Sequence, residues 1–323
     1  MISNRENVSH QMENQTFTTE FLLLGFGDLH HLQVLVFLLF LLIYIMTLIG
    51  NLLIVLLVVA NQHLHTPMYF FIGNLSCLET CYSSTLLPRM LVSFLNGDRT
   101  VSVSGCIAQF YFFGCLAGTE CFLLSAMSYD RYSAICNPLH YPNIMNNKMC
   151  FILASSSWIG GFAVNTIIIS FMSKLTFCGP NKIDHFFCDF APLMELSCSD
   201  THLITVVDLS FSTICALPPF LLTLASYVCI IATILRIPST SGRQKAFSTC
   251  SSHLIVVTSF FGTLILVYIV PSSPSTVDVK KIFSVFYTVL TPLVNPLVYS
   301  FRNKEVNIAL RKFTSKYLHF QKK

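Results

Sequence analysis

The stretch Cys106–Cys136, CIAQFYFFGCLAGTECFLLSAMSYDRYSAIC, decides the fold of this chain. It is long and apolar enough to cross a lipid bilayer, for which about 20 apolar residues suffice. Yet it carries a carboxylate, Glu120, at its middle and the pair Asp130-Arg131 near its end. Ionisable groups at membrane depth are costly, so they usually face the interior of a helix bundle and mark function. We therefore predict that this stretch is the central helix of a membrane bundle.

Helical geometry places the important groups of this stretch on one side. At 1.5 Å per residue, Cys106 and Arg131 lie roughly 37 Å apart, one near each membrane face. With 100° between residues, one inward stripe holds Phe113, Ala117, Glu120, Leu124 and Arg131. One helix therefore connects an outer cysteine, a wall of small residues, a buried acid and an inner arginine, which indicates the central helix of a signalling bundle.

The composition of the whole chain is typical of a membrane protein. Of its 323 residues, 54% are hydrophobic and 11% are charged, whereas a soluble domain carries roughly a quarter charged residues. The apolar residues fall into seven blocks, about 32–59, 68–93, 104–133, 149–171, 203–236, 246–270 and 281–301. We therefore expect an all-α membrane protein with a seven-helix bundle over 32–301, an extracellular tail over 1–31 and an amphipathic cytoplasmic helix and tail over 302–323. No Arg-rich, aromatic-interleaved patch occurs, so nucleic acid is not an expected partner.

The distribution of Lys and Arg predicts the orientation. With the N-terminus outside, the inner segments hold most of the basic residues, against only Asp130 and Glu305 as acids. Positive loops stay cytoplasmic, so the N-terminus is expected outside and the C-terminus inside, with the basic C-terminal helix against membrane lipids. The sequons at Asn7 and Asn14 would then be glycosylated.

Four cysteines lie in segments predicted to be outside: Cys106, Cys178, Cys188 and Cys198. An oxidising location favours disulfides, and four cysteines permit three pairings. A zinc site with His185 is the alternative, although cysteine spacings of ten residues fit no common zinc pattern.

Polar residues in four different blocks point to a shared interior site. Asn51, Glu79, Glu120 and Asn295 each interrupt an apolar span. Polar groups in hydrocarbon need partners, and one common cluster would satisfy all four residues. The alternative is that each residue is satisfied separately.

Five motifs follow in order at the predicted inner ends of the blocks: LHTPMYFF (64–71), MSYDRYSAIC (127–136), SY (226–227), KAFSTCSSHL (245–254) and PLVNPLVYSFRNKEV (292–306). With NQTFTTEFLLLGF (14–26) and the outer FCGPNKIDHFFCD (177–189), the chain closely resembles the tetrapod-type (class II) olfactory receptors, a branch of the rhodopsin-like G-protein-coupled receptors. One motif such as DRY is only suggestive, but five in register are highly specific. The chain departs from the family at Glu79, usually Asp, at Ser128 and Ser133, more often Ala and Val, and at FFG (260–262), usually FYG.

The resemblance implies an odorant receptor of the plasma membrane and not an enzyme. Such a receptor binds a small, mostly hydrophobic volatile molecule in the outer half of the bundle. It then activates a heterotrimeric G protein of the stimulatory olfactory type, which raises cyclic AMP. The resemblance also pairs Cys106 with Cys188 and Cys178 with Cys198.

The inward stripe and the family pattern together predict the residues that contact the ligand. They are Phe113, Gly114, Ala117, Gly118, Phe190, Phe211, Ser212, Cys215, Phe261, Leu264, Ile265, Tyr268, Val285 and Thr288. This apolar lining with few hydrogen-bonding groups suits a hydrophobic ligand with one polar group. For any one of these residues, packing between helices is the equally good alternative. Tyr268 is the best individual candidate, because a buried hydroxyl needs a partner.

The resemblance assigns two further roles. Asn51, Glu79, Glu120 and Asn295 resemble the sodium site of related receptors, so we expect them to hold Na⁺ at rest. Alternatively, one carboxylate is protonated, because two close like charges in a low dielectric cannot both stay bare. No other cofactor is expected. At the inner end, Asp130 is expected to hold Arg131 at rest, and Tyr132, Tyr227 and Tyr299 surround the arginine that later faces the G protein.

A small transporter or channel is the competing class of protein, because buried acids also mark ion paths. The sequence shows no inverted repeats, and it has both the DRY and the NPLVY motif, which favour the receptor. An enzyme is less well supported, because no nucleophile and base can be recognised.

Overall fold

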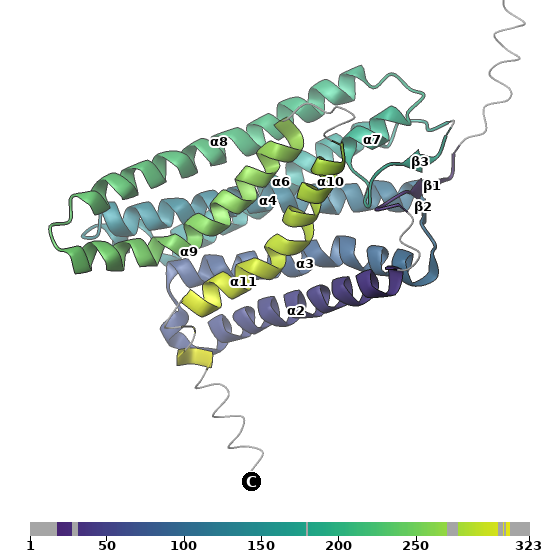
Figure 1. Ribbon diagram of the computed structural model, residues 1–323. Helices are drawn as coiled ribbons and strands as arrows, with labels where there is room; N and C mark the ends of the chain where they lie inside the picture. Colours follow the sequence, from purple (N-terminus) through teal and green to yellow (C-terminus); the bar gives the residue numbers. More distant parts are fainter. Residues whose placement is uncertain are drawn as a thin grey trace, which may run out of the picture.

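Seven long helical segments form a bundle (Figure 1). The computed structural model describes residues 18–27, 32–178, 180–269, 277–302, 306 and 308–310. The segments are α2 (Gln33–Ala60), α3 (Pro67–Asn96), α4 (Val103–Cys136), α6 (Asn147–Met172), α8 (His202–Leu235), α9 (Thr240–Leu264) with η2 (Ile265–Ile269), and α10 (Val277–Val285) with η3 (Phe286–Leu290) and α11 (Thr291–Arg302). The predicted all-α bundle is confirmed, and each predicted block overlaps one of these segments.

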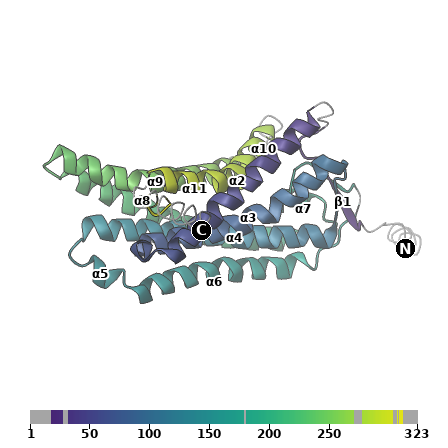
Figure 2. The same cartoon turned by 90° about the horizontal axis from the view of Figure 1, so that it is seen from below.

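Six of these segments are long and apolar enough to cross a membrane, and α3 is the exception. Helix α3 carries Glu79, Arg89 and several hydroxyl side chains, which lower its mean hydropathy. It nevertheless lies between α2 and α4 (Figure 2). Its neighbours bury Ser76, Glu79 and Ser83, so α3 can span the bundle as the seventh helix.

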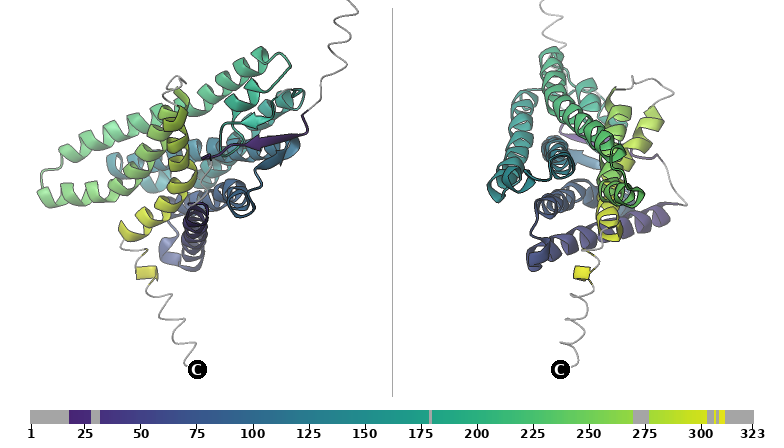
Figure 3. Two further views of the ribbon diagram at one scale, coloured as in Figure 1. Left: turned by 45° about the vertical axis from the view of Figure 1, so that its right-hand side comes forward. Right: turned by 90° about the vertical axis from the view of Figure 1, so that its left-hand side faces the viewer.

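Helix α4 lies at the centre, with the other helices around it (Figure 3). Its first turn is capped by Ser102, whose hydroxyl accepts a hydrogen bond from the Gly105 backbone N–H at 3.1 Å. The buried Glu120 is only 2% exposed, so the mid-depth acid faces the interior rather than lipid.

The close approach of α4 and α6 depends on a glycine. A Cβ on Gly161 of α6 would lie 2.3 Å from the Thr119 hydroxyl and 2.6 Å from the Cys115 carbonyl. Small residues let helix backbones pack closely within membranes, where van der Waals contact drives association. Gly161 therefore positions α6 directly against the helix that carries Glu120.

A small β-sheet covers the end of the bundle that the sequence predicts to be extracellular, which we call the outer end. Strand β1 (Glu20–Leu23) pairs antiparallel with β2 (Thr100–Ser102) and parallel with β3 (Lys182–Ile183). Phe21, 1% exposed, anchors the sheet by packing edge-on against Phe177 at 5.2 Å. The N-terminal segment thereby joins two outer loops into one cover.

Short helices complete the two ends of the bundle. Helix α7 (Phe190–Glu195) belongs to the long outer loop, and α5 (Tyr141–Ile144) lies between α4 and α6. The sheet and the end of α11 lie at opposite ends of the molecule (Figure 1).

Several predicted features fall on residues that are not described. The sequons at Asn7 and Asn14 lie outside the described residues, as does most of the C-terminal helix predicted over 302–323. Of that helix, Val306 and Ala309 are described as helical and buried.

Candidate functional site

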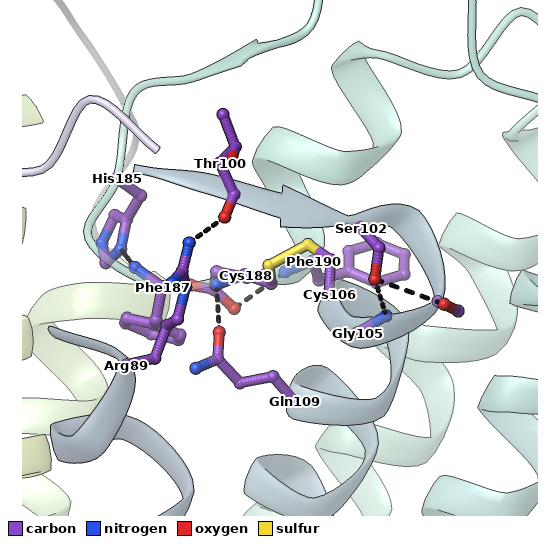
Figure 4. Close-up of a disulfide and its surroundings, with 12 residues drawn as sticks. Arg89, Thr100, Ser102, Gly105, Cys106, Gln109, His185, Phe187, Cys188 and Phe190 are labelled. Carbon is purple, nitrogen blue, oxygen red and sulfur yellow. Dashed lines mark hydrogen bonds between the residues drawn. A yellow bond between two sulfur atoms is a disulfide. The ribbon is translucent and has the colours of Figure 1, made fainter. Parts of the chain in front are cut away.

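The outer loop is tied to the central helix by a buried disulfide (Figure 4). Cys106 of α4 bonds to Cys188, and both residues are fully buried. The Cys188 backbone N–H donates to Gln109 Oε1 at 3.0 Å, which adds a second link to α4. A further disulfide joins Cys178 to Cys198 within the loop. Both pairs are those that the family resemblance implies.

The disulfide holds an aromatic cluster beneath the loop. The Phe113 ring, 4% exposed, lies 4.9 Å from Phe187, 5.1 Å from Tyr82 and 6.0 Å from Tyr287, measured between ring centroids. On the loop, Phe190 lies 6.2 Å from Phe110 of α4. Phe113 and Phe190 therefore lie where the ligand site is expected, at the outer half of the bundle.

Two glycines predicted to leave space for a ligand instead pack against α6. A Cβ on Gly114 would lie 2.3 Å from the Asn165 side-chain oxygen. A Cβ on Gly118 would lie 3.4 Å from the Gly161 Cα. The small size of Gly114 and Gly118 therefore serves the approach of two helices, and contact of either residue with a ligand stays a prediction. Ala117 is half-buried beside the main core.

The other predicted ligand residues differ widely in burial. Cys215, Phe261 and Thr288 are buried, Phe211, Leu264 and Val285 are half-buried, and Ser212, Ile265 and Tyr268 are exposed on their helices. Phe261 packs on Phe220 at 5.4 Å, and the Thr288 hydroxyl donates to the Ser284 carbonyl at 2.6 Å. Phe261 and Thr288 thus have packing partners, Tyr268 is exposed, and ligand contact of all three stays a prediction.

A small open hollow of about 30 Å³ lies at the outer end, between residues 23–27 and α3. Phe26, Arg89, Phe94, Arg99 and Phe186 contribute to its lining. None of the predicted ligand residues lines it, so it is separate from the aromatic cluster around Phe113.

Sequence reasoning missed a polar chain near Tyr268. The Tyr268 and Tyr287 hydroxyls are hydrogen-bonded at 2.8 Å. The Tyr268 hydroxyl lies near the Asp189 carboxylate, which accepts a hydrogen bond from the Phe190 backbone N–H at 2.8 Å. Burial raises the pKa of Asp189 to about 6, although these hydrogen bonds and nearby Lys280 act in the opposite direction. Asp189 follows a loop cysteine, and a loop has no periodicity that reveals which way a side chain faces.

The four polar residues of the spans are all buried, between 0% and 3% exposed. Asn295 donates a short hydrogen bond to Glu79, and Asn51 donates to the Pro292 carbonyl at 3.0 Å. Glu79 and Glu120 are close enough to interact electrostatically. One oxygen of each of Asn51, Glu79 and Glu120 has no hydrogen-bond partner among the described residues. The two carboxylate oxygens could bind a proton, and all three oxygens could coordinate a cation.

At the inner end, an ion pair holds the arginine of the DRY motif. Arg131 Nη2 lies 2.7 Å from Asp130 Oδ2, and the Tyr141 hydroxyl donates to Asp130 Oδ1 at 2.8 Å. Burial and the neighbouring Asp130 carboxylate both raise the pKa of Tyr141. Tyr141 was missed from the sequence because it lies on the short helix α5, outside the motif.

A second missed residue is His253 of α9, which is fully buried. Its Nδ1 is hydrogen-bonded to the Tyr227 hydroxyl at 2.6 Å, while its Nε2 has no partner among the described residues. The Tyr299 hydroxyl is also buried and unpaired within the described part of the chain. Tyr132 is half-buried and packs beside Tyr227. His253 stands within KAFSTCSSHL, and that motif was the available signal.

The zinc alternative fails for His185. Cys178, Cys188 and Cys198 are all used in disulfides, and no cluster of three or more metal-binding side chains occurs among the described residues. His185 instead stacks on Phe186 at 4.6 Å and meets Phe187 edge-on at 4.5 Å. It is therefore a packed residue of the outer loop.

Acid is expected to destabilise the outer loop through His185. Burial, and secondarily Lys281, lower the pKa of His185 to about 4, whereas an unfolded histidine titrates near about 6.5. Because the folded pKa is the lower one, the neutral ring stabilises the fold above about pH 6.5, and this stabilisation is lost as the pH falls towards about 4.

Thermal unfolding of purified receptor at about pH 7.5 and about pH 5 measures this effect. The wild type should lose more in Tm than His185→Phe, which keeps the aromatic packing but cannot titrate. Asp189 titrates in the same range, but it is common to both proteins. Equal losses would exclude His185 as the cause.

The structure is that of a seven-helix membrane receptor of the rhodopsin-like class. Its helices bury Glu79 and Glu120, and a disulfide ties the outer loop to α4. The sequence model of the olfactory receptor family matches residues 40–316. The chain is 49% identical to "Olfactory receptor 5AP2" of Mus musculus, over 95% of this chain and 97% of that protein. It is 48% identical to the Homo sapiens protein of the same name, over 94% and 96%, and 48% identical to "Olfactory receptor 11A1" of Homo sapiens, over 93% and 94%. The chain belongs to the olfactory receptor family, and it is a multi-pass membrane receptor rather than an enzyme.

Proposed function

We propose that this receptor binds a small, mostly hydrophobic volatile molecule in the outer half of its bundle. The supporting observation is the aromatic cluster around Phe113, which the Cys106–Cys188 disulfide keeps beneath the outer loop. Aromatic and apolar side chains with few polar groups are typical of sites for such ligands. The accessible Tyr268 lies at the edge of this region and is hydrogen-bonded to Tyr287 of the cluster.

The receptor signals through a stimulatory G protein of the olfactory type, which raises cyclic AMP. It lies in the plasma membrane with its N-terminus outside and its C-terminus in the cytoplasm. The bias of Lys and Arg towards the inner segments supports this orientation. The disulfides at the end of the bundle that carries the sheet agree with an oxidising exterior.

The experiment is a cyclic AMP assay in transfected cells exposed to a panel of volatile odorants. The receptor should raise cyclic AMP with at least one ligand, and mock-transfected cells should not respond. Ligand-dependent currents that persist without a G protein would instead support the channel hypothesis.

The buried acid cluster holds a sodium ion in the resting receptor, or one of its carboxylates is protonated. The donor set fits a cation, because Glu79, Glu120 and Asn51 each present an unpaired buried oxygen. Two neighbouring carboxylates in a low dielectric need a cation or a proton between them. Activation then shifts the population from this resting state to a second arrangement of the bundle.

Glu120→Gln is expected to remove the sodium dependence of the odorant response. Replacing sodium with a large organic cation should change the potency of an agonist at least about fivefold in the wild type, the usual lower range of coupling between sites. The variant should lack this change, because one of the two carboxylates is gone. Glu195→Gln, at an exposed position on α7, is the matched control. If Glu120→Gln responded like the wild type across sodium concentration and pH, the cluster would have no such role.

A further inference from the structure

A tight turn follows β1 directly, and we call its residues 24–27 the N-terminal turn. Gly25 and Gly27 have φ angles of 60° and 77°, a left-handed conformation that is open to glycine but disfavoured for residues with a Cβ. The Arg99 guanidinium donates a hydrogen bond to the Gly27 carbonyl at 2.8 Å. The turn is therefore held in one shape, which fixes the position of Phe26 between the two glycines.

The Phe26 ring stacks on rings from α3 and from the outer loop. Its centroid lies 5.3 Å from that of Phe186 in the loop and 6.3 Å from that of Phe94 in α3, with interplanar angles of 15° and 19°. The Phe40 ring of α2 also lies at 6.3 Å. Aromatic pairs at such distances contribute stability beyond their buried area. Phe26 therefore joins the outer loop to α2 and α3.

The N-terminal turn also bonds the backbone of the loop on one side of Phe187. The Gly25 backbone N–H donates to the His185 carbonyl at 3.1 Å. On the other side, the neighbouring Cys188 is bonded to Cys106 of α4 (Figure 4). Phe187 thus lies between a hydrogen-bonded attachment to the N-terminal turn and a covalent attachment to the central helix.

Phe187 is the loop residue that reaches the aromatic cluster of the proposed ligand site. It is 0% exposed, and its ring lies 5.1 Å from Phe186 and 4.9 Å from Phe113. A continuous series of ring contacts therefore leads from Phe26 through the loop to Phe113. A side chain that is already ordered before a ligand arrives removes part of the entropic cost of binding.

The hollow beside the N-terminal turn does not offer a second ligand site. Its volume is about 30 Å³, whereas pockets for small molecules measure about 300–1,000 Å³. Any effect of the turn on an odorant must therefore act through the loop.

We propose that Phe26 is a positioning residue of the ligand site, and that the N-terminal turn holds Phe187 over Phe113 before the ligand binds. This inference rests on the proposed odorant-binding function. Phe186 transmits the effect, because its ring contacts both Phe26 and Phe187. The segment that begins the described chain thus takes part in odorant recognition as well as in the outer sheet.

A double-mutant cycle tests this directly. Cells that express the receptor are exposed to a panel of volatile aliphatic and aromatic alcohols, aldehydes, ketones and esters, and the most potent agonist among them serves as the probe. Phe26→Ala removes three ring contacts, so the potency of the probe in the cyclic AMP assay should fall about tenfold. In a Phe187→Leu background, which keeps an apolar side chain and a measurable response, the same change should cost at most about threefold, because the ring that Phe26 positions is gone.

The matched control is Phe21→Ala, a phenylalanine of the same segment whose ring contacts Phe177 at 5.2 Å. Its effect on potency should be the same in both backgrounds. Surface staining shows whether each variant reaches the membrane, and Phe26→Leu, which keeps an apolar side chain without the ring, replaces Phe26→Ala if the latter is retained inside the cell.

An unchanged potency in the Phe26 variant, or an equal loss with and without the Phe187 ring, would overturn the positioning role and leave odorant reception intact. Full potency in Phe187→Leu alone would overturn it as well, because Phe187 would then have no part in the site. If the surface-expressed wild type responded to no odorant in a wide panel, both the positioning role and the proposed function would be overturned.

Discussion

Replacing Cys188 with serine is expected to abolish the odorant-evoked cyclic AMP response. The bond to Cys106 spans a sequence separation of 82 residues, and removal of a native disulfide typically costs about 2–5 kcal/mol. Phe187, beside Cys188 in the chain, packs on Phe113. Release of the loop would therefore remove one wall of the aromatic cluster as well as destabilise the fold. Surface staining and a dose–response curve for cyclic AMP measure the two losses separately.

Cys198→Ser provides the matched control. Its bond to Cys178 spans only 20 residues, so the loss of chain entropy is about 1 kcal/mol smaller. Cys198 is exposed, and a serine there meets water rather than a buried environment. This variant should keep a reduced response. A full response in Cys188→Ser, or an equal defect in both variants, would refute the central role of the Cys106–Cys188 bond.

Replacing Arg131 with alanine is expected to remove G-protein activation while the receptor still reaches the cell surface. Arg131 is half-buried and its guanidinium is paired with the fully buried Asp130 at 2.7 Å. Hydrogen bonds to charged groups contribute about 1.5–3 kcal/mol, so the loss of the arginine contact to the G protein should lower the evoked response at least about tenfold. Cyclic AMP normalised to surface receptor is the measurement. An evoked response that survives in Arg131→Ala would contradict the assigned role.

The opposite effect is expected when the partner of the arginine is neutralised. Asp130→Asn removes the charge that holds Arg131, so cyclic AMP in the absence of odorant should rise. Tyr141→Phe removes only the 2.8 Å hydrogen bond to Asp130 and keeps the ion pair, so its increase should be smaller. The ranking of these two variants distinguishes a resting lock from a purely structural ion pair.

The helices could be predicted from sequence because hydrocarbon requires long, continuous apolar segments. The outer sheet could not be predicted, since β3 has only two residues and its partner strand lies far away in the chain. Periodicity along α4 showed correctly that Glu120 faces inward, but it could not show what lies opposite. Gly114 illustrates this limit, because a small residue suits a cavity or a close helix equally, and only the structure shows that Asn165 lies against it.

The candidate site was predictable mainly where a motif marks it. The DRY segment drew attention to Arg131, and mid-span acids are conspicuous in any apolar block. The sequence does not single out Tyr82 or Tyr287, because tyrosine is common in membrane helices. Only the structure shows that both rings contact Phe113. Asp189 was missed for a related reason, since its partner Tyr268 comes 79 positions later in the chain (268 minus 189).

The sheet at the outer end also constrains how the receptor is made. Leu22 of β1 pairs with Lys182 of β3, so the first strand must wait for a partner synthesised 160 residues later (182 minus 22). Strand β2 can pair with one edge of β1 earlier, but the other edge stays unpaired until β3 is made, and exposed strand edges favour aggregation. During synthesis there is therefore an interval in which one edge of β1 is open to other chains, and the sheet can close only after the first four long helices, α2, α3, α4 and α6, have been made.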